Sequence, residues 1–114
     1  MLHNTRPISW IGAARKSFDA FPADAQKVFF SALHIATDGA KADSAKPMSG
    51  MGSGVFEIAL RHTGSAFRVV YAVRIGEALW VVHAFQKKST QGIKTPKHEI
   101  DLIKQRLKSL RESK

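Results

Sequence analysis

The chain lacks cysteine altogether, has half as many acidic as basic residues, and contains no long apolar run. Without cysteine it can form neither disulfide bonds nor thiolate metal sites, as is usual for proteins of a reducing compartment. Its N-terminus has no apolar core of the kind that signal peptides carry, and no stretch approaches the roughly 18 apolar residues of a membrane span. We therefore expect a cytoplasmic protein that does not enter a membrane.

What the chain does contain is enough apolar material for one hydrophobic core. Of its 114 residues, 44% are hydrophobic and 24% are charged, which predicts a single globular domain over residues 1–114. The net charge is +9, and residues 55–114 hold twelve of the 18 basic residues but only five of the nine acidic ones. This excess favours binding to polyanions, nucleic acid above all. The alternative is that the charges only keep the protein in solution.

Two N-terminal segments have the periodicity of amphipathic helices. In residues 12–21 the apolar side chains recur on one side, and Pro22 ends the segment. In residues 23–37 apolar side chains recur at steps of three and four residues, and Gly39 provides an exit. The two segments predict a helical hairpin whose apolar face covers a sheet.

Three segments in the middle of the chain predict a meander of antiparallel strands. Residues 55–62 and 66–74 alternate in the two-residue period of strands, and residues 78–85 are apolar on both faces, as in a central strand. The links between them are short enough for hairpins. Residues 7–11 are a candidate edge strand, and the glycine-rich residues 38–54 predict a loop.

The C-terminal segment predicts a third helix, from about Pro96 to Glu112. Thr95 is a candidate N-cap, and Pro96 suits the first helical turn. Its apolar side chains form one stripe and its basic side chains lie off that stripe, so the basic surface either binds a partner or only solubilises the helix. Together, the predicted elements indicate an α+β fold.

Two lysines, Lys87 and Lys88, directly follow the most apolar strand, and Lys94 comes just before the last helix. Side chains that leave the end of a buried strand start from a rigid support, which a catalytic site requires. These lysines are therefore candidates for a site at the rim of the sheet.

The neighbouring strands carry further charged residues at alternating positions. Arg68 lies on one strand, and Glu57 and Arg61 lie on another. Cations gathered on one face repel one another unless an anion binds, and arginine can hold phosphate oxygens in a bidentate geometry. The strip predicts a phosphodiester-binding surface, and the alternative is a set of scattered, solvated charges.

Four segments, taken in their order and spacing, resemble the RelE/ParE toxin superfamily and specifically its HigB-like, phage-derived branch: VFEI (55–58), FRVVY (67–71), HAFQKKSTQGIKTP (83–96) and EIDLIKQRL (99–107). The resemblance implies a RelE-like α+β fold in which two N-terminal helices and a C-terminal helix pack on a small twisted antiparallel sheet of three to four strands. It also implies the toxin of a type II toxin–antitoxin system, an endoribonuclease that cleaves translated mRNA in the ribosomal A site without a metal or cofactor. Its expected partners are a helix-turn-helix antitoxin, mRNA and the ribosome.

Such cleavage requires deprotonation of the RNA 2′-hydroxyl, stabilisation of charge on the phosphate, and protonation of the departing 5′-oxygen. By the resemblance, Arg68 corresponds to an arginine that contacts the scissile phosphate. Lys87 or Lys88 corresponds to the group that stabilises charge or protonates the leaving oxygen. Arg61 occupies another strand position that is basic in RelE.

The general base is left open by the resemblance, because Glu57 and Ala59 stand where RelE has lysines. Glu57 either serves as the base or pairs with Arg61 or Arg68. His83 either titrates in the working range as a base or is a buried, hydrogen-bonded histidine of an apolar strand.

Further basic residues are predicted to contact RNA: Lys94, Arg74, Lys97 and Lys104. The histidines do not share a metal-ligand spacing, so no metal site is predicted. Tyr71 has the opposite strand parity from Arg68 and is expected in the core. Two alternatives to RNA cleavage remain: a ParE-like toxin that inhibits DNA gyrase, and a relative without catalysis that binds an antitoxin or operator DNA.

Overall fold

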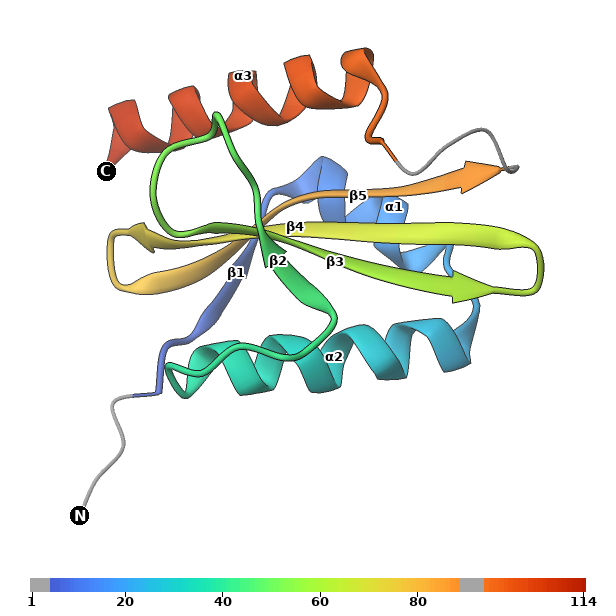
Figure 1. Ribbon diagram of the computed structural model, residues 1–114. Coiled ribbons are helices and arrows are strands. Elements are labelled where there is room, and N and C mark those ends of the chain that lie inside the picture. The colour runs from blue at the N-terminus through green and yellow to red at the C-terminus, as the bar shows by residue number, and fades with distance from the viewer. Residues whose placement is uncertain (1–4, 89–93) are drawn as a thin grey trace.

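The computed structural model describes residues 5–88 and 94–114 as a five-stranded sheet with helices on both faces (Figure 1). In chain order the elements are β1 (Ile8–Trp10), α1 (Gly12–Asp19), α2 (Ala23–Thr37), β2 (Ala45–Pro47), β3 (Val55–His62), β4 (Ser65–Ile75), β5 (Ala78–Lys88) and α3 (Lys97–Ser113). The strand order across the sheet is β1, β5, β4, β3, β2. Helices α1 and α2 cover one side and α3 covers the other, which confirms the predicted α+β class and the predicted placement of its helices.

The sheet is larger than the predicted three or four strands. β2, β3, β4 and β5 pair antiparallel, whereas the edge strand β1 pairs parallel to β5. The short strand β2 lies within residues 38–54, which the sequence predicts to be a loop. Three residues that include a proline are too few for a visible alternation, so the local pattern does not reveal this strand.

Alternation along the strands sorts the buried side chains into two layers. The layer beneath α1 and α2 includes Phe18, Phe29, Ile58, Val69 and Tyr71. The layer beneath α3 includes Val55, Val70, Val82, Ile103 and Leu107. Full burial of a large aliphatic side chain contributes roughly 1.5–3 kcal/mol. The fully buried Ile103 and nearly buried Leu107 therefore hold α3 firmly on the strands that carry the predicted polar strip.

A β-bulge decides which side chains of β5 face α3. Val70 pairs with His83 while the next residue, Tyr71, pairs with Val81, so Val82 is the extra residue of the bulge. Val81 packs in the layer beneath α1 and α2, and Val82 packs beneath α3. As a result, two consecutive side chains, those of Val82 and His83, are directed to the α3 side.

The helices begin and end close to the predicted positions. α2 spans the predicted residues, and Pro22 precedes it as its N-cap. α3 begins at Lys97, with Pro96 as its N-cap and no side-chain hydrogen bond at that cap. None of the described helices combines the length and the apolar character that crossing a membrane requires.

Candidate active site beneath the C-terminal helix

An ion pair between two neighbouring strands forms the centre of the candidate site. Arg68 in β4 donates from Nη1 to Glu57 Oε1 in β3 over 3.1 Å. The two side chains are 12% and 17% exposed, so the pair is largely removed from water and loss of one partner would leave a poorly solvated charge. Of the two partners predicted for Glu57, the structure selects Arg68, while Arg61 lies exposed on β3.

The second oxygen of Glu57 is held by the segment that leads into α3. Thr95 Oγ1 donates to Glu57 Oε2 at 2.8 Å. The prediction that Thr95 caps α3 is therefore wrong, because its hydroxyl is used by a strand residue 38 positions earlier in the chain. This bond joins the start of α3 to the centre of the sheet, and it fixes the orientation of the carboxylate.

A cavity of about 330 Å³ opens beside the carboxylate of Glu57. Its lining includes Thr95 and two exposed lysines, Lys46 and Lys94. Lys46 is the register partner of Glu57 on β2. The sequence does not single out Lys46, which is one of two lysines in the glycine-rich residues 38–54. The cavity combines one carboxylate with two ammonium groups, a combination that suits a phosphate ester with a hydroxyl to be deprotonated.

The lysines at the end of β5 lie close to the same region. Lys87 pairs with Ala66 in the strand register, and its Nζ donates to the backbone oxygen of Lys94 at 2.7 Å. This bond brings the end of β5 to the segment before α3. The backbone of Lys88 belongs to β5 and pairs with Ser65, while its side chain lies outside the part of the chain that the structure describes.

His83 is enclosed by two residues of α3. Its Nε2 lies 2.6 Å from Glu99 Oε1, and Arg106 Nη1 lies 2.9 Å from its Nδ1 and also donates to Val82 O. A guanidinium can only donate, so Nδ1 accepts and Nε2 carries the proton that is donated to Glu99. Neither ring nitrogen then offers a lone pair to a substrate. The geometry favours the buried, hydrogen-bonded histidine over the general base.

Burial also disfavours the charged form of His83, which is only 5% exposed. Desolvation lowers the pKa of its imidazole below the usual 6.5, assisted by the nearby charges of Arg106 and His98 and opposed by Glu99. The neutral imidazole therefore links α3 to β5 as a structural element. The sequence does not reveal these two partners, because Glu99 and Arg106 resemble the other charged residues on the surface of a helix.

Three of the residues predicted to contact RNA lie apart from this cluster. Lys97 forms an exposed ion pair with Asp101, and Lys104 lines a separate hollow along α3. In an ideal strand Arg74 would share a face with Arg68, but the pairing of β4 with β5 is irregular between Ala72 and Ile75. Ile75, not Arg74, packs beneath α3, and Arg74 lines a different pocket.

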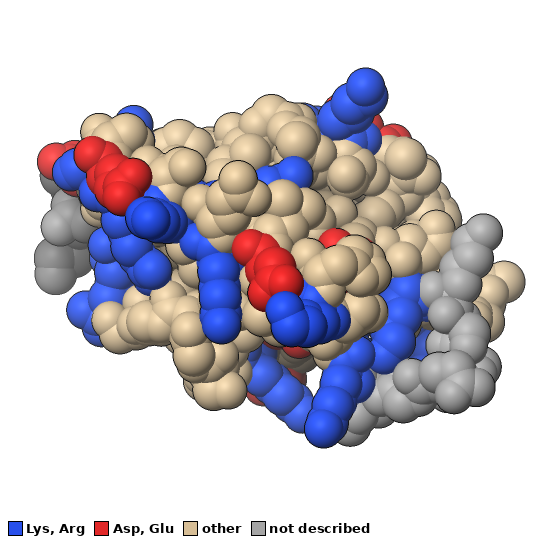
Figure 2. Space-filling model, turned by 90° about the horizontal axis from the view of Figure 1, so that it is seen from above, with Lys and Arg blue, Asp and Glu red and all other residues tan. Residues whose placement is uncertain are grey.

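The wider surface around the site is basic. Figure 2 looks down on the face that carries α3 and shows more Lys and Arg than Asp and Glu, with several basic side chains gathered along one edge. Within residues 5–88 and 94–114, no three His, Asp or Glu side chains lie together in a way that could hold a metal ion. The chemistry that the described residues offer here is that of one carboxylate, one guanidinium and several ammonium groups.

Comparisons with known proteins bear on the family and on the fold. The model of a family described as phage-derived Gp49-like proteins (DUF891) matches residues 16–108. No curated protein matches the chain.

Solved structures of RelE toxins have the same fold. A double arginine-to-alanine mutant of the E. coli toxin RelE in the free state is 18% identical, with a TM-score of 0.58 over 74% of this chain and 83% of that one. The isolated E. coli RelE toxin is 16% identical, with a TM-score of 0.58 over 85% and 95%. The RelBE2 toxin–antitoxin complex of Mycobacterium tuberculosis gives 12% identity and a TM-score of 0.51 over 75% and 94%. At these identities the likeness establishes the fold.

Proposed function

Because the chain belongs to the family of phage-derived Gp49-like proteins, we propose that it is the toxin of a toxin–antitoxin pair and that it cleaves messenger RNA. The RelE-like fold supports the first part of this proposal. The second part depends mainly on one observation, the Glu57–Arg68 pair, whose carboxylate lines a cavity that Lys46 and Lys94 also line. A phosphodiester is the anion that such a site on a strongly basic protein would meet in RNA.

Arg68 is proposed to bind the scissile phosphate. Its bond to Glu57 fixes the guanidinium within the sheet, and preorganised charge of this kind is effective where negative charge develops in the transition state. Lys87, at the rim of the same face, is proposed to stabilise that charge or to protonate the departing 5′-oxygen. Lys46 and Lys94 would hold the flanking phosphates.

Glu57 is proposed as the general base that removes the proton from the 2′-hydroxyl. Its two oxygens accept hydrogen bonds from Arg68 and Thr95, and an ionised carboxylate has about four lone-pair sites, so it can accept a further hydroxyl. His83 is a poorer candidate, since both of its ring nitrogens are engaged by α3. The 2′-oxygen then attacks the phosphorus and the bond to the 5′-oxygen breaks, without a metal ion.

The proposed substrate is mRNA under translation, cut in the ribosomal A site, and the proposed partner is a helix-turn-helix antitoxin. The similarity to a RelBE toxin–antitoxin complex supports an antitoxin. The support for translation dependence comes from the RelE-like fold, so the experiment must test the need for translation directly.

The decisive experiment compares wild type with Arg68→Ala in cells, following growth and mapping mRNA ends by primer extension with and without a translation inhibitor. We expect cleavage by the wild type to require translation, and Arg68→Ala to reduce the rate about 10²- to 10³-fold. Lys16→Ala, which removes an exposed cation on α1, is the matched control and should cleave normally.

Two outcomes would contradict the proposal. A folded Arg68→Ala variant with full toxicity would exclude the assigned role of this arginine. Growth arrest with intact mRNA and with gyrase-linked DNA breaks would instead identify a ParE-like toxin that does not cut RNA.

A further inference from the structure

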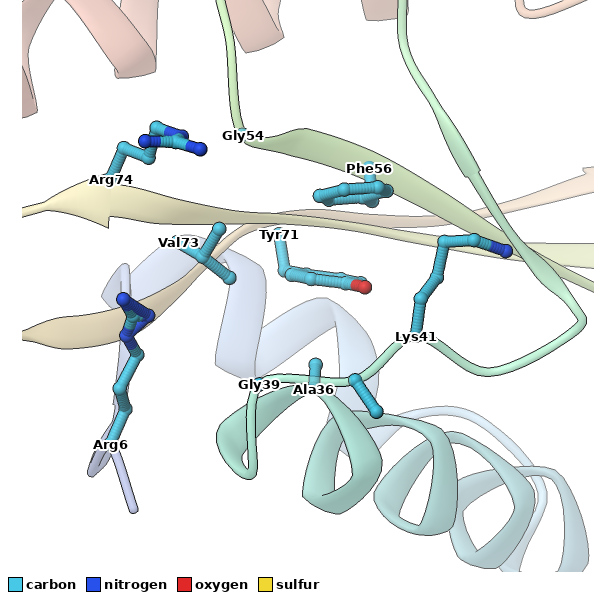
Figure 3. Close-up of a pocket in the computed structure, with 10 residues that line it drawn as sticks. Arg6, Ala36, Gly39, Lys41, Gly54, Phe56, Tyr71, Val73 and Arg74 are labelled. Atoms are coloured by element: carbon cyan, nitrogen blue, oxygen red, sulfur yellow. The ribbon is translucent and has the colours of Figure 1, made fainter. Parts of the chain in front are cut away.

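Figure 3 shows a second pocket, of about 410 Å³. Its apolar wall lies on the opposite side of the sheet from Glu57 and Arg68, which share the strand face of Val70. This wall is formed by Phe56, Tyr71 and Val73 of the sheet and by Ala36 at the end of α2. These side chains belong to the layer beneath α1 and α2 or pack against it. A ligand in this pocket would therefore leave the candidate active site open.

The polar part of the lining is cationic. Arg6 precedes β1, Lys41 follows α2 and Arg74 lies near the end of β4, and no Asp or Glu is among the lining residues. Three segments that are far apart in sequence thus bring positive charge to one hollow. Each of these cations can bind an anionic group of a ligand that enters the pocket.

The backbone supports the positions of two of these cations. Gly54 has a φ of +78°, and a Cβ built there would lie only 2.6 Å from Arg74 Cγ. The arginine stem can therefore cross the backbone at this point because residue 54 has no side chain. Lys41 Nζ donates to the backbone oxygens of Ala42 and Ala45, at 3.3 and 2.9 Å, which holds the ammonium group beside the pocket.

The hydroxyl of Tyr71 provides an independent indication of a ligand. The side chain is 1% exposed, and its ring stacks on Phe56 with centroids 5.3 Å apart. The structure shows no hydrogen bond from this hydroxyl to another described residue, and the hydroxyl is not one of the fully buried unpaired atoms, so it borders the pocket that Tyr71 lines. Burial raises the pKa of this hydroxyl to about 12, so it keeps its proton and can donate. Figure 3 shows its oxygen pointing along the pocket toward the Lys41 segment.

We propose that this pocket binds a nucleoside monophosphate, with Arg6 or Arg74 holding the phosphate and the Tyr71 hydroxyl donating to the ligand. Guanidinium groups bind phosphate oxygens with charge-assisted hydrogen bonds. The apolar wall accommodates the nucleoside, and a volume near the lower end of the range for ligand pockets suits one nucleotide rather than a folded RNA. The site is separate from the proposed cleavage site and does not depend on it.

The test is an NMR titration of the isotope-labelled full chain with nucleoside 5′-monophosphates, with inorganic phosphate and with uncharged nucleosides. We expect a monophosphate to shift the amide signals of Phe56, Tyr71 and Val73, and to bind more tightly than phosphate or nucleoside alone. The double variant Arg6→Gln/Arg74→Gln should weaken this binding by at least about tenfold.

Two further variants make the test specific. Lys16→Gln/Lys27→Gln removes the same charge from exposed positions of α1 and α2 and should leave the affinity unchanged. Tyr71→Phe keeps the ring and its stacking on Phe56 and should weaken binding severalfold without lowering the melting temperature.

Three results would overturn the proposal. If both double variants weakened binding equally, the binding would be general electrostatic attraction and not recognition by this pocket. Shifts confined to the neighbourhood of Glu57 and Arg68 would place the ligand on the other face. Inorganic phosphate that binds as tightly as the nucleotide would exclude a nucleoside site. Because Arg68→Gln alters the cleavage site alone, its titration separates failure of this proposal from failure of the proposed ribonuclease.

Discussion

Glu57 is the residue in which position and chemistry coincide most closely. It lies in β3, receives one hydrogen bond from the neighbouring strand and another from the segment before α3, and borders a cavity. Both bonds fix the orientation of the carboxylate. The cleavage rate should therefore depend on the charge of Glu57 and not only on the shape of its side chain.

Replacing Glu57 by glutamine tests the charge while keeping the size of the side chain. We expect about 10²-fold slower RNA cleavage, the lower end of the usual contribution of a general base. Single-turnover cleavage of mRNA in a reconstituted translation system is the measurement. A cleavage rate within a factor of about two of wild type, with a preserved fold, would remove Glu57 from the mechanism.

His83 predicts how stability depends on pH. Its folded-state pKa is lowered by burial, so the unfolded chain binds a proton more readily, and stability must fall as pH drops below about 6.5. We expect the free energy of unfolding in urea to decrease from about pH 7.5 to 5, and His83→Gln to lose part of this dependence. His34→Gln, at an exposed position of α2, should retain it. A pH profile that His83→Gln leaves unchanged would contradict the inferred burial of the neutral ring.

At the scale of elements, the position of α3 determines the site. Apolar contacts from Ile103 and Leu107 anchor the helix, the His83–Glu99 bond ties its first turn to β5, and Thr95 ties its approach to β3. The helix therefore covers one end of the polar strip and holds the orienting groups in place. A substitution that removes one of these contacts should slow cleavage before it unfolds the protein.

Thr95 offers the mildest way to loosen this link. Thr95→Val preserves the shape but removes the donor to Glu57, which should cost about 1–2 kcal/mol of unfolding free energy. It should also slow cleavage, because the carboxylate loses its orientation. Thr95→Ser restores a hydroxyl and should recover most of both quantities. If valine and serine variants cleave equally well, the bond has no role in positioning Glu57.

At the scale of the whole molecule, charge governs the encounter with RNA. The net charge of +9 and the basic edge seen in Figure 2 favour binding to RNA. This binding should weaken as the salt concentration rises, because the release of counterions from the RNA then contributes less free energy. The interior of the site contains a paired arginine, so much of this attraction must come from the exposed lysines around it.

A substitution of Lys46 tests whether an exposed lysine beside the site contributes to this attraction. For a single-stranded RNA, each phosphate contact contributes about 0.7 to the slope of log affinity against log salt concentration. Lys46→Gln should reduce the slope by about this amount, measured by fluorescence anisotropy with a short RNA. Lys16→Gln, on the far side of the sheet, should leave the slope unchanged. Equal effects of the two variants would mean that Lys46 makes no specific phosphate contact.

The sequence by itself determined the elements and their buried faces. The three- and four-residue steps of residues 23–37 and the alternation of residues 55–62 are local patterns, and the observed α2 and β3 match them. Side-chain periodicity within one element depends only on backbone geometry. For the same reason the α+β class, the interior position of β5 in the sheet and the burial of Tyr71 were predictable.

Only the tertiary structure decided which charged groups meet. Lys46 lies opposite Glu57 on a strand too short to recognise from the sequence, and His83 faces Glu99 because of a bulge in β5. Arg74 lies away from Arg68 because of a second irregularity in the same pairing. Register, bulges and the docking of α3 arise from contacts between residues far apart in the chain, and one shifted residue turns a side chain to the opposite face of a sheet.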